Sequence, residues 1–221
     1  MEMEKILIDN LTGLKTQKQF FVDWDSRLQR HAAGKGELNL ALALIDIDFF
    51  KSYNDQYGHL TGDEIIKSLA DHLALGLTGL AEVYRYGGEE FAILFPDHER
   101  EEAFLLMEKT RFSFAIDHKF QCDSKTVTLP VRFSTGISSF GDDGTGVQEI
   151  LRKADDALYR AKETGRNKIC LSKEEKMVPK TVHYTQAQLN RLGKLKEKLG
   201  VVEAILLREA LDDLLRKYKT T

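Results

Sequence analysis

Two β-rich runs flank a pair of glycines in the stretch Val83-Tyr84-Arg85-Tyr86-Gly87-Gly88-Glu89-Glu90-Phe91-Ala92-Ile93-Leu94-Phe95. This pattern predicts a β-hairpin, and Gly87-Gly88 predicts a two-residue primed turn in which both positions need a positive φ. A second apolar run, residues 38–48, follows the loop-like residues 33–36 and ends in Asp46-Ile47-Asp48. Its length and unbroken apolar character predict a strand that is buried on both faces. Both segments therefore predict a β-sheet.

The rest of the first 171 residues alternates between helical and extended patterns. Apolar residues at helical spacing predict helices, and runs rich in β-forming residues predict strands. The predicted helices are residues 16–32, 63–75, 99–117 and 147–164, and the further strands are residues 126–140 and 168–171. This order predicts an α+β fold in which helices pack on a largely antiparallel sheet.

Composition excludes several classes of protein. The chain has 221 residues, of which 42% are hydrophobic and 30% are charged, as in folded globular proteins rather than disordered ones. No apolar run is long enough for a membrane span, and the acidic start Met1-Glu2-Met3-Glu4 is unlike a signal peptide. Cys122 and Cys170 are too few for a disulfide scaffold or a four-cysteine zinc site. These features predict a cytoplasmic protein without a membrane partner.

The last fifty residues differ in composition from the rest. From Ser172 onward there are 11 Lys and Arg against 7 Asp and Glu, so a basic tail follows an acidic body. This charge split favours a contact with nucleic acid. We predict a main domain over residues 1–172, a linker over 173–179 that contains Pro179, and a C-terminal module over 180–221.

The tail has its own pattern of elements. Residues 181–185 alternate polar and apolar side chains, as in a strand, and two amphipathic helices are predicted over 186–199 and 202–218, separated by Gly200. About forty residues are too few for an independent core, so the tail is expected either to oligomerise or to pack on the main domain.

The acidic residues at two predicted strand ends form the candidate site. Strand periodicity places Asp46 and Asp48 on one side of their strand, and Glu89-Glu90 lies at the hairpin. If the hairpin lies beside the first strand, up to four carboxylates converge, and such oxygen ligands suit Mg²⁺. Lys51 is placed to meet a phosphate, and the glycines allow backbone to approach a ligand. The set indicates metal-assisted phosphoryl or nucleotidyl transfer rather than paired acids that merely cap strand ends in solvent.

Over residues 9–171 the chain resembles the GGDEF-domain diguanylate cyclases. The resemblance rests on five motifs in order, which are Asp9-Asn10-Leu11-Thr12-Gly13-Leu14, Asp46-Ile47-Asp48-Phe49-Phe50-Lys51-Ser52-Tyr53-Asn54-Asp55, Gly58-His59-Leu60-Thr61-Gly62-Asp63, Arg85-Tyr86-Gly87-Gly88-Glu89-Glu90-Phe91 and Ala154-Asp155-Asp156-Ala157-Leu158-Tyr159-Arg160-Ala161-Lys162-Glu163-Thr164-Gly165-Arg166-Asn167. It implies a nucleotidyl cyclase-like sheet of the ferredoxin-like palm type. It also implies that two GTP become cyclic di-GMP and two pyrophosphates, with Mg²⁺ or Mn²⁺, where two copies of the domain meet in a homodimer.

The resemblance also implies roles for individual residues. The metal ligands would be Asp46, the Ile47 carbonyl and Glu89. Lys51, Lys162 and Arg166 would hold the phosphates, helped by the backbone N–H groups of Phe49 and Phe50 and by the close approach that Gly87 and Gly88 allow. Asn54 and Asp63 would read the guanine edge, and an aspartate at this position favours guanine over adenine. Glu90 would lie beside the ribose and the reacting centre, and whether it is the base that takes the 3′-hydroxyl proton is left open.

One motif of the family is missing. Many relatives carry Arg-x-x-Asp shortly before the glycines, where this chain has Thr78-Gly79-Leu80-Ala81. Neither Thr78 nor Ala81 can make a charged contact with a product dimer. Product inhibition through that site is therefore not expected.

The tail resembles a ribbon-helix-helix module, in which two chains pair their strands and interlock four helices. The resemblance implies that Val182 and Tyr184 face the core and that the paired strands enter the DNA major groove. The candidate DNA contacts are Lys180, Thr181, His183 and Thr185. The turn Gly200-Val201-Val202-Glu203 departs from the pattern, because it lacks the Ser or Thr cap that meets phosphate. A plain helical hairpin packed on the main domain is the alternative.

Two functions from different classes follow. The first is an active diguanylate cyclase that its tail holds as a dimer. The second is a DNA-binding regulator whose GGDEF domain senses GTP or cyclic di-GMP without turnover. A sensor of that kind has usually lost metal or guanine ligands, whereas this chain keeps all five of those residues, which are Asp46, Asn54, Asp63, Glu89 and Glu90. The sequence therefore favours the enzyme.

Overall fold

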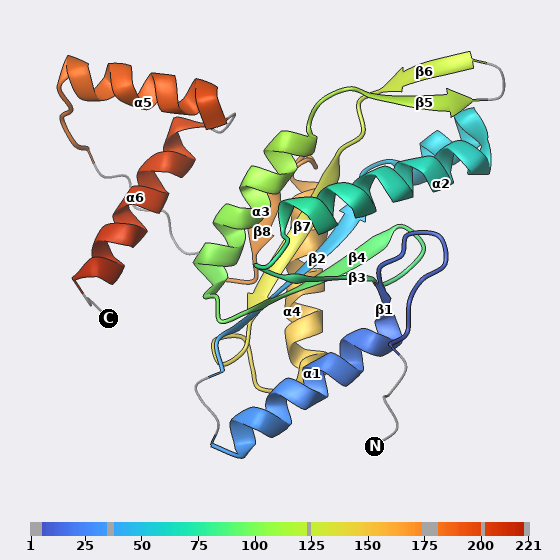
Figure 1. Cartoon of the computed structure of the whole chain (residues 1–221), viewed down its shortest axis with the longest axis horizontal. Coiled ribbons are helices and arrows are strands. Elements are labelled where there is room, and N and C mark those ends of the chain that lie inside the picture. Colours follow the sequence, from blue (N-terminus) through green and yellow to red (C-terminus); the bar gives the residue numbers. More distant parts are fainter. Residues whose placement is uncertain (1–5, 35–37, 123–124, 174–180, 200–201, 219–221) are drawn as a thin grey trace. The chain divides into compact units, whose positions relative to one another are not determined.

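The computed structural model describes residues 6–34, 38–122, 125–173, 181–199 and 202–218. The chain divides into two compact units, residues 1–174 and 175–221, and each unit is described by itself. The elements of the first unit (Figure 1) are β1 (Lys15–Thr16), α1 (Gln17–Ala32), β2 (Leu40–Ile47), α2 (Phe50–Gly76), β3 (Glu82–Arg85), β4 (Glu90–Pro96), α3 (Arg100–Phe114), β5 (His118–Cys122), β6 (Lys125–Leu129), β7 (Phe133–Ser139), α4 (Val147–Glu163) and β8 (Ile169–Leu171).

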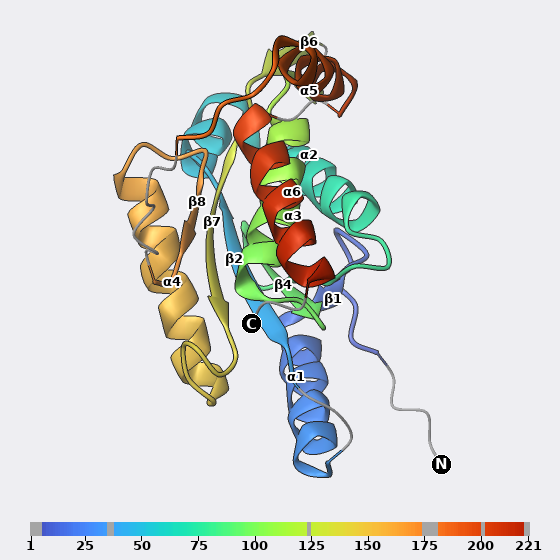
Figure 2. The same cartoon turned by 90° about the vertical axis from the view of Figure 1, so that its left-hand side faces the viewer.

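A six-stranded sheet forms the centre of the first unit. Its strand order is β1-β3-β4-β2-β7-β8, and β2 pairs antiparallel with both β4 and β7. Helices α2 and α3 contribute to the core on one face of the sheet, and α1 and α4 contribute to the core on the other (Figures 1 and 2). All residues of β2 are buried because both faces are covered. The predicted α+β fold and its central buried strand are confirmed.

Close packing of α4 on β7 depends on one glycine. A Cβ atom added to Gly136 would lie 2.0 Å from the Ala154 carbonyl oxygen and 2.3 Å from the Leu158 amide nitrogen. Both atoms belong to backbone and cannot rotate away. Glycine at this position therefore lets the helix approach the sheet, and this approach places the C-terminal end of α4 near the end of β2.

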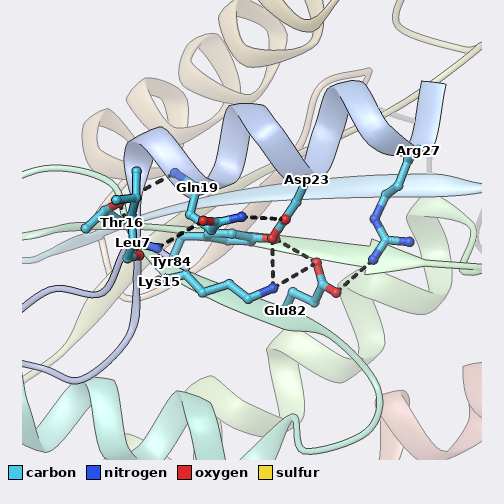
Figure 3. A network of polar contacts seen from close by, with 8 residues as sticks. All are labelled: Leu7, Lys15, Thr16, Gln19, Asp23, Arg27, Glu82 and Tyr84. Atoms are coloured by element: carbon cyan, nitrogen blue, oxygen red, sulfur yellow. Dashed lines mark hydrogen bonds and ion pairs between the residues drawn. The ribbon is translucent and has the colours of Figure 1, made fainter. Parts of the chain in front are cut away.

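A partly buried polar network holds the N-terminal elements against β3 (Figure 3). The Tyr84 hydroxyl lies 2.8 Å from Asp23 Oδ2 and 2.6 Å from Glu82 Oε2. Lys15 Nζ lies 2.7 Å from the same Asp23 oxygen, and Arg27 Nη2 lies 2.8 Å from Glu82 Oε1. Burial and the two carboxylates raise the pKa of Tyr84 far above its ordinary value, so the hydroxyl remains a donor. The network fixes α1 and β1 against the strand that leads into the glycine loop.

Two predicted boundaries in the middle of the chain are wrong. The strand predicted over residues 126–140 is two strands, because Pro130 follows β6 and proline cannot donate to a ladder. The helix predicted over 99–117 ends at Phe114, and residues 118–122 form β5, which pairs with β6 in a separate two-stranded sheet. This small β5–β6 hairpin was not predicted.

The helix predicted over residues 63–75 is also too short. Helix α2 runs from Phe50 to Gly76 and contains a break at Gly58, where φ is 81° and ψ is 161°. That backbone conformation favours glycine. The residues before the break were not predicted as helical, although Phe50, Tyr53 and Tyr57 follow helical spacing and pack against one core cluster.

The second unit contains α5 (Gln186–Leu199) and α6 (Glu203–Lys217), which confirm the two predicted tail helices. Residues 181–185 form no ladder in the single chain, so the strand predicted there is not observed. A ribbon strand needs a partner strand. In the ribbon-helix-helix fold, which the tail resembles, that partner comes from a second copy of the chain. Thr185 and Gln188 form reciprocal capping bonds at the start of α5.

A membrane span was not expected from the sequence. Within the described ranges, no helix has both the length and the apolar character that crossing a bilayer requires.

Candidate active site

Three carboxylates meet where β2 ends and β4 begins. Asp46 is paired with Glu90 across the β2–β4 ladder, and Glu89 is the residue before β4. The Asp46 carboxylate is largely buried and lies 2.8 Å from Lys162 Nζ, which projects from the last turn of α4. Burial raises the pKa of Glu89 and of Glu90, the charge of Asp46 raises both further, and Lys162 partly offsets this. The cluster therefore carries excess negative charge that a bound cation would relieve.

The fourth predicted carboxylate does not join this cluster. Asp48 is almost fully buried, and its two oxygens accept hydrogen bonds from Ser134 Oγ at 2.7 Å and from the Asn167 N–H at 2.8 Å. Arg166 and Asn167 both have a positive φ, 60° and 46°. The expectation of four converging carboxylates is therefore corrected to three, because Asp48 instead holds the left-handed turn that carries Arg166. The only sequence signal for this structural role of Asp48 was its position, two residues after Asp46.

The glycine loop differs from the predicted turn. Residues 86–89 connect the two strands, and neither Gly87 nor Gly88 is among the glycines with a positive φ, so the predicted primed turn is wrong. The N–H groups of Tyr86 and Gly87 both donate to the Glu90 carbonyl, at 2.8 and 3.1 Å. A Cβ atom on Gly87 would lie 2.4 Å from Glu90 Oε2. The glycine thus leaves room for the Glu90 carboxylate.

Arg85 holds the loop to the N-terminal segment. Its guanidinium donates to the carbonyls of Gly87 and Gly88, at 3.3 and 2.8 Å, and to Asp9 Oδ1 at 2.9 Å. The same Asp9 oxygen accepts from the Thr12 N–H at 2.9 Å. The segment from Asp9 therefore has a structural role, because it holds the glycine loop through Arg85.

The start of α2 is suited to bind an anion. Phe49 caps the helix in the left-handed conformation, with φ 59°, and its carbonyl accepts from the N–H groups of Ser52 and Tyr53. The N–H groups of Phe50 and Lys51 precede the first intrahelical donors, as at any helix N-terminus. The Arg166 guanidinium lies over the Phe49 ring, with Cζ 4.6 Å from its centroid. A bulky residue with a positive φ is strained, and such strain is common at ligand sites.

Asn54 and Asp63 lie on α2, on opposite sides of its break. A Cβ atom on Gly62 would lie 2.0 Å from Asn54 Oδ1, so Asn54 reaches the backbone next to Asp63. In the described part of the chain, this buried Asn54 oxygen has no hydrogen-bond partner. Unpaired buried polar atoms are rare in folded proteins, and one explanation is an absent ligand.

The donor set fits a magnesium ion that a substrate helps to bind. Among the described residues, no group of three or more His, Cys, Asp or Glu is arranged to hold a metal by itself. Asp46, Glu89 and the carbonyl of Ile47, the last residue of β2, offer two carboxylates and one carbonyl. Mg²⁺ is often held by one or two carboxylates together with phosphates and water. These residues therefore suit a metal that arrives with a phosphorylated ligand.

The turn at residues 78–81 has no charged side chain. Thr78 donates its hydroxyl to the Ala74 carbonyl at 2.7 Å, which caps the end of α2. The segment is a short exposed connection from α2 to β3.

Two family models match different parts of the chain. A model of the family described as "Diguanylate cyclase, GGDEF domain" matches residues 6–168, and one described as "Ribbon-helix-helix domain" matches residues 176–219. The response regulator PleD of Caulobacter vibrioides is 35% identical over 167 residues, which are 76% of this chain and 36% of PleD. Diguanylate cyclase A of Treponema denticola is 33% identical over 172 residues, which are 77% of this chain and 46% of that protein.

A solved structure shares the fold. The GGDEF domain of DgcB from Caulobacter crescentus, solved in complex with c-di-GMP, is 28% identical and gives a TM-score of 0.68 over 78% of this chain and 99% of that domain. The curated relatives are longer, since the chain spans between 36% and 46% of the two named above.

Proposed function

The chain belongs to the GGDEF-domain family of diguanylate cyclases, and from this premise we propose that it condenses two GTP into cyclic di-GMP and two pyrophosphates. The observation that carries the proposal is the cluster of Asp46, Glu89 and Glu90 around Lys162, next to the anion-binding start of α2. Residues suited to a metal and residues suited to phosphate are thus close together, which supports nucleotidyl transfer. Retention of all three acids supports turnover over the alternative, a sensor that binds nucleotide without reacting.

The proposed roles follow the geometry. Asp46, Glu89 and the Ile47 carbonyl would hold Mg²⁺ or Mn²⁺. When bound, the metal would neutralise charge on the α-phosphate and on the departing pyrophosphate. The triphosphate would be held by the N–H groups of Phe49 and Phe50 and by three cationic side chains, those of Lys51, Lys162 and Arg166.

Guanine recognition is assigned to α2. The Asn54 amide, whose buried Oδ1 has no partner, and the half-buried Asp63 carboxylate would bind the guanine edge. Guanine offers its N1–H and its exocyclic amine to the Asp63 carboxylate, and adenine does not. A buried acceptor left unpaired by the wrong base gives strong discrimination.

In the proposed reaction, the 3′-hydroxyl oxygen of one GTP attacks the α-phosphorus of the other. The bond from that phosphorus to pyrophosphate breaks, pyrophosphate leaves, and the hydroxyl proton passes to water, either directly or through a base such as Glu90. The second phosphodiester forms in the same way with the roles exchanged. Glu90 lies at the edge of the cluster, where the ribose would approach. Each domain supplies one GTP, so two domains must meet for either bond to form.

We propose that the tail keeps two domains together. Its apolar side chains remain exposed in the single chain, including Val182 at 55%, Leu211 at 53% and Leu214 at 51%. Tyr184 and leucines of α5 and α6 also line a cavity of about 430 Å³. A second copy that covers these surfaces would raise the local concentration of the partner domain.

The decisive experiment incubates the purified full chain with GTP and Mg²⁺ and separates the products by chromatography. Cyclic di-GMP and pyrophosphate in a ratio of one to two are expected. A confirmed dimer that binds GTP yet releases no cyclic dinucleotide would support the alternative, a DNA-binding regulator that senses the nucleotide.

Replacing Gly62 by alanine tests the guanine site. The added Cβ would displace the Asn54 amide, which is the end of a side chain, so the fold should survive while guanine binding weakens. The KM for GTP is expected to rise about tenfold, because one hydrogen bond in a desolvated site is lost. Steady-state kinetics measure this, and an unchanged KM would contradict the assignment of Asn54.

The tail is also a candidate DNA-binding module. Thr181, His183 and Thr185 are exposed, although Thr185 also caps α5, and Lys180 lies outside the described residues. We propose contact through these side chains once two copies pair their strands. Retention of the full chain on mixed duplex DNA at low salt, with steep weakening as salt increases, is the expected result. Elution that salt does not affect would count against phosphate contacts.

A further inference from the structure

The β5–β6 hairpin lies beside α2 (Figure 1) and has no role in the proposed chemistry. A two-stranded sheet is only marginally stable by itself in water, so it depends on what it packs against. Phe120 and Leu129 bury their side chains in the core cluster that also contains residues of α2. The hairpin is therefore a fixed part of the α2 face of the domain.

One strand of the hairpin contacts α2 at its break and beyond it. The Thr61 hydroxyl donates to the Tyr57 carbonyl at 2.9 Å and lies 3.4 Å from the Gln121 carbonyl oxygen. The Gln121 N–H donates to Glu64 Oε2 at 3.0 Å, and the Cys122 thiol lies 3.5 Å from the Tyr57 carbonyl. The backbone at the break and the half of α2 after it are thus tied to β5.

The other end of the hairpin contacts the half of α2 before the break. The Tyr53 hydroxyl donates to the carbonyl of Pro130 at 3.2 Å, and Pro130 directly follows β6. The hairpin therefore bridges the two halves of the helix.

This bridge bears on guanine recognition, because Asn54 precedes the break and Asp63 follows it. The relative position of these two side chains depends on the angle between the helix halves. Continuous helical hydrogen bonding cannot set that angle, because Gly58 has the non-helical dihedral angles φ 81° and ψ 161°. We propose that the β5–β6 hairpin sets it, with Tyr53 and Glu64 as positioning residues for base specificity. This inference rests on the proposed function.

Replacing Glu64 by alanine tests the bridge. The KM for GTP is expected to rise about tenfold with kcat changed less than about twofold, because small displacements of binding groups are costly. Preference for GTP over inosine triphosphate, whose base lacks the exocyclic amine, should fall by a similar factor. Glu64→Gln keeps an acceptor oxygen and should restore most of the preference. Asp71→Ala, an exposed change on the same helix, is the matched control.

Tyr53→Phe removes only one hydroxyl and should act in the same direction, so the test does not depend on the folding of one variant. If the parent forms cyclic di-GMP and both Tyr53→Phe and Glu64→Ala keep its KM and its base preference, the inference is wrong and the proposed function stands. If the parent binds GTP without turnover, the proposed function fails, and equilibrium affinities for GTP and inosine triphosphate still test the bridge. A parent that binds neither nucleotide would overturn both.

Discussion

Replacing Glu89 by glutamine is expected to slow the formation of cyclic di-GMP on the order of a thousandfold, because a metal ligand is worth several kcal/mol in the transition state. Glutamine has nearly the shape of glutamate but lacks its charge. The substitution therefore tests the charge of the cluster around Asp46 and Lys162 rather than its packing. Chromatography of the products from GTP and Mg²⁺ measures the rate.

The same substitution is expected to stabilise the protein without metal. Burial raises the pKa of Glu89 and Asp46 raises it further, so the ionised carboxylate opposes folding at neutral pH. The folded state then binds more protons than the unfolded state, and the free energy of unfolding declines as the pH rises from the ordinary value of 4.5 through the raised folded-state pKa. Glu89→Gln removes the part of this decline that Glu89 contributes, whereas Glu90, whose pKa is raised by the same causes, keeps its own part. Thermal unfolding across this pH range, without and with Mg²⁺, measures it.

The control is Glu163→Gln, which makes the same charge change at an exposed position beside Lys162. It should keep the parental rate and the parental pH dependence of stability. If Glu89→Gln is as active as Glu163→Gln, then Glu89 is not a ligand of the metal.

The sequence was most informative where burial and pairing are local. An unbroken apolar run predicted β2, and the glycine pair predicted the β3–β4 hairpin. The pairing of β4 with β2 was a condition of the predicted site rather than a prediction, and the ladder that places Glu90 opposite Asp46 meets this condition. The geometry of the glycine turn could not be predicted from the sequence. Arg85 binds the loop carbonyls and is itself held by Asp9, which lies 76 residues away in the sequence.

Other features depend on contacts that no local pattern records. Asp48 resembles a metal ligand in the sequence, but Ser134 and Asn167 take up both of its oxygens. The break in α2 and the β5–β6 hairpin contact each other, and the sequence predicted neither of them. The tail strand was predicted from alternation alone, and a single chain offers it no ladder partner.

Disrupting the apolar face of the tail is expected to separate the chain into monomers and to lower its activity. In the double variant Leu211→Glu and Leu214→Glu, two carboxylates replace leucines that are about half exposed in the single chain, at 53% and 51%. If a second copy buries this face, removing the two carboxylates from water costs more free energy than the apolar dimer contact contributes. The specific activity at micromolar protein is expected to fall about a hundredfold, because the effective concentration of the partner domain is lost.

The dependence on protein concentration separates this cause from damage to the active site. Two intact half-sites still meet by collision, so the specific activity of the double variant should rise with protein concentration, whereas that of the parent should stay constant. Lys196→Glu, a charge change at an exposed polar position of α5, should remain dimeric and fully active. Light scattering gives the mass of each protein. A double variant with the parental mass and rate would mean that these leucines pack within one chain and that the cyclase domains meet by another surface.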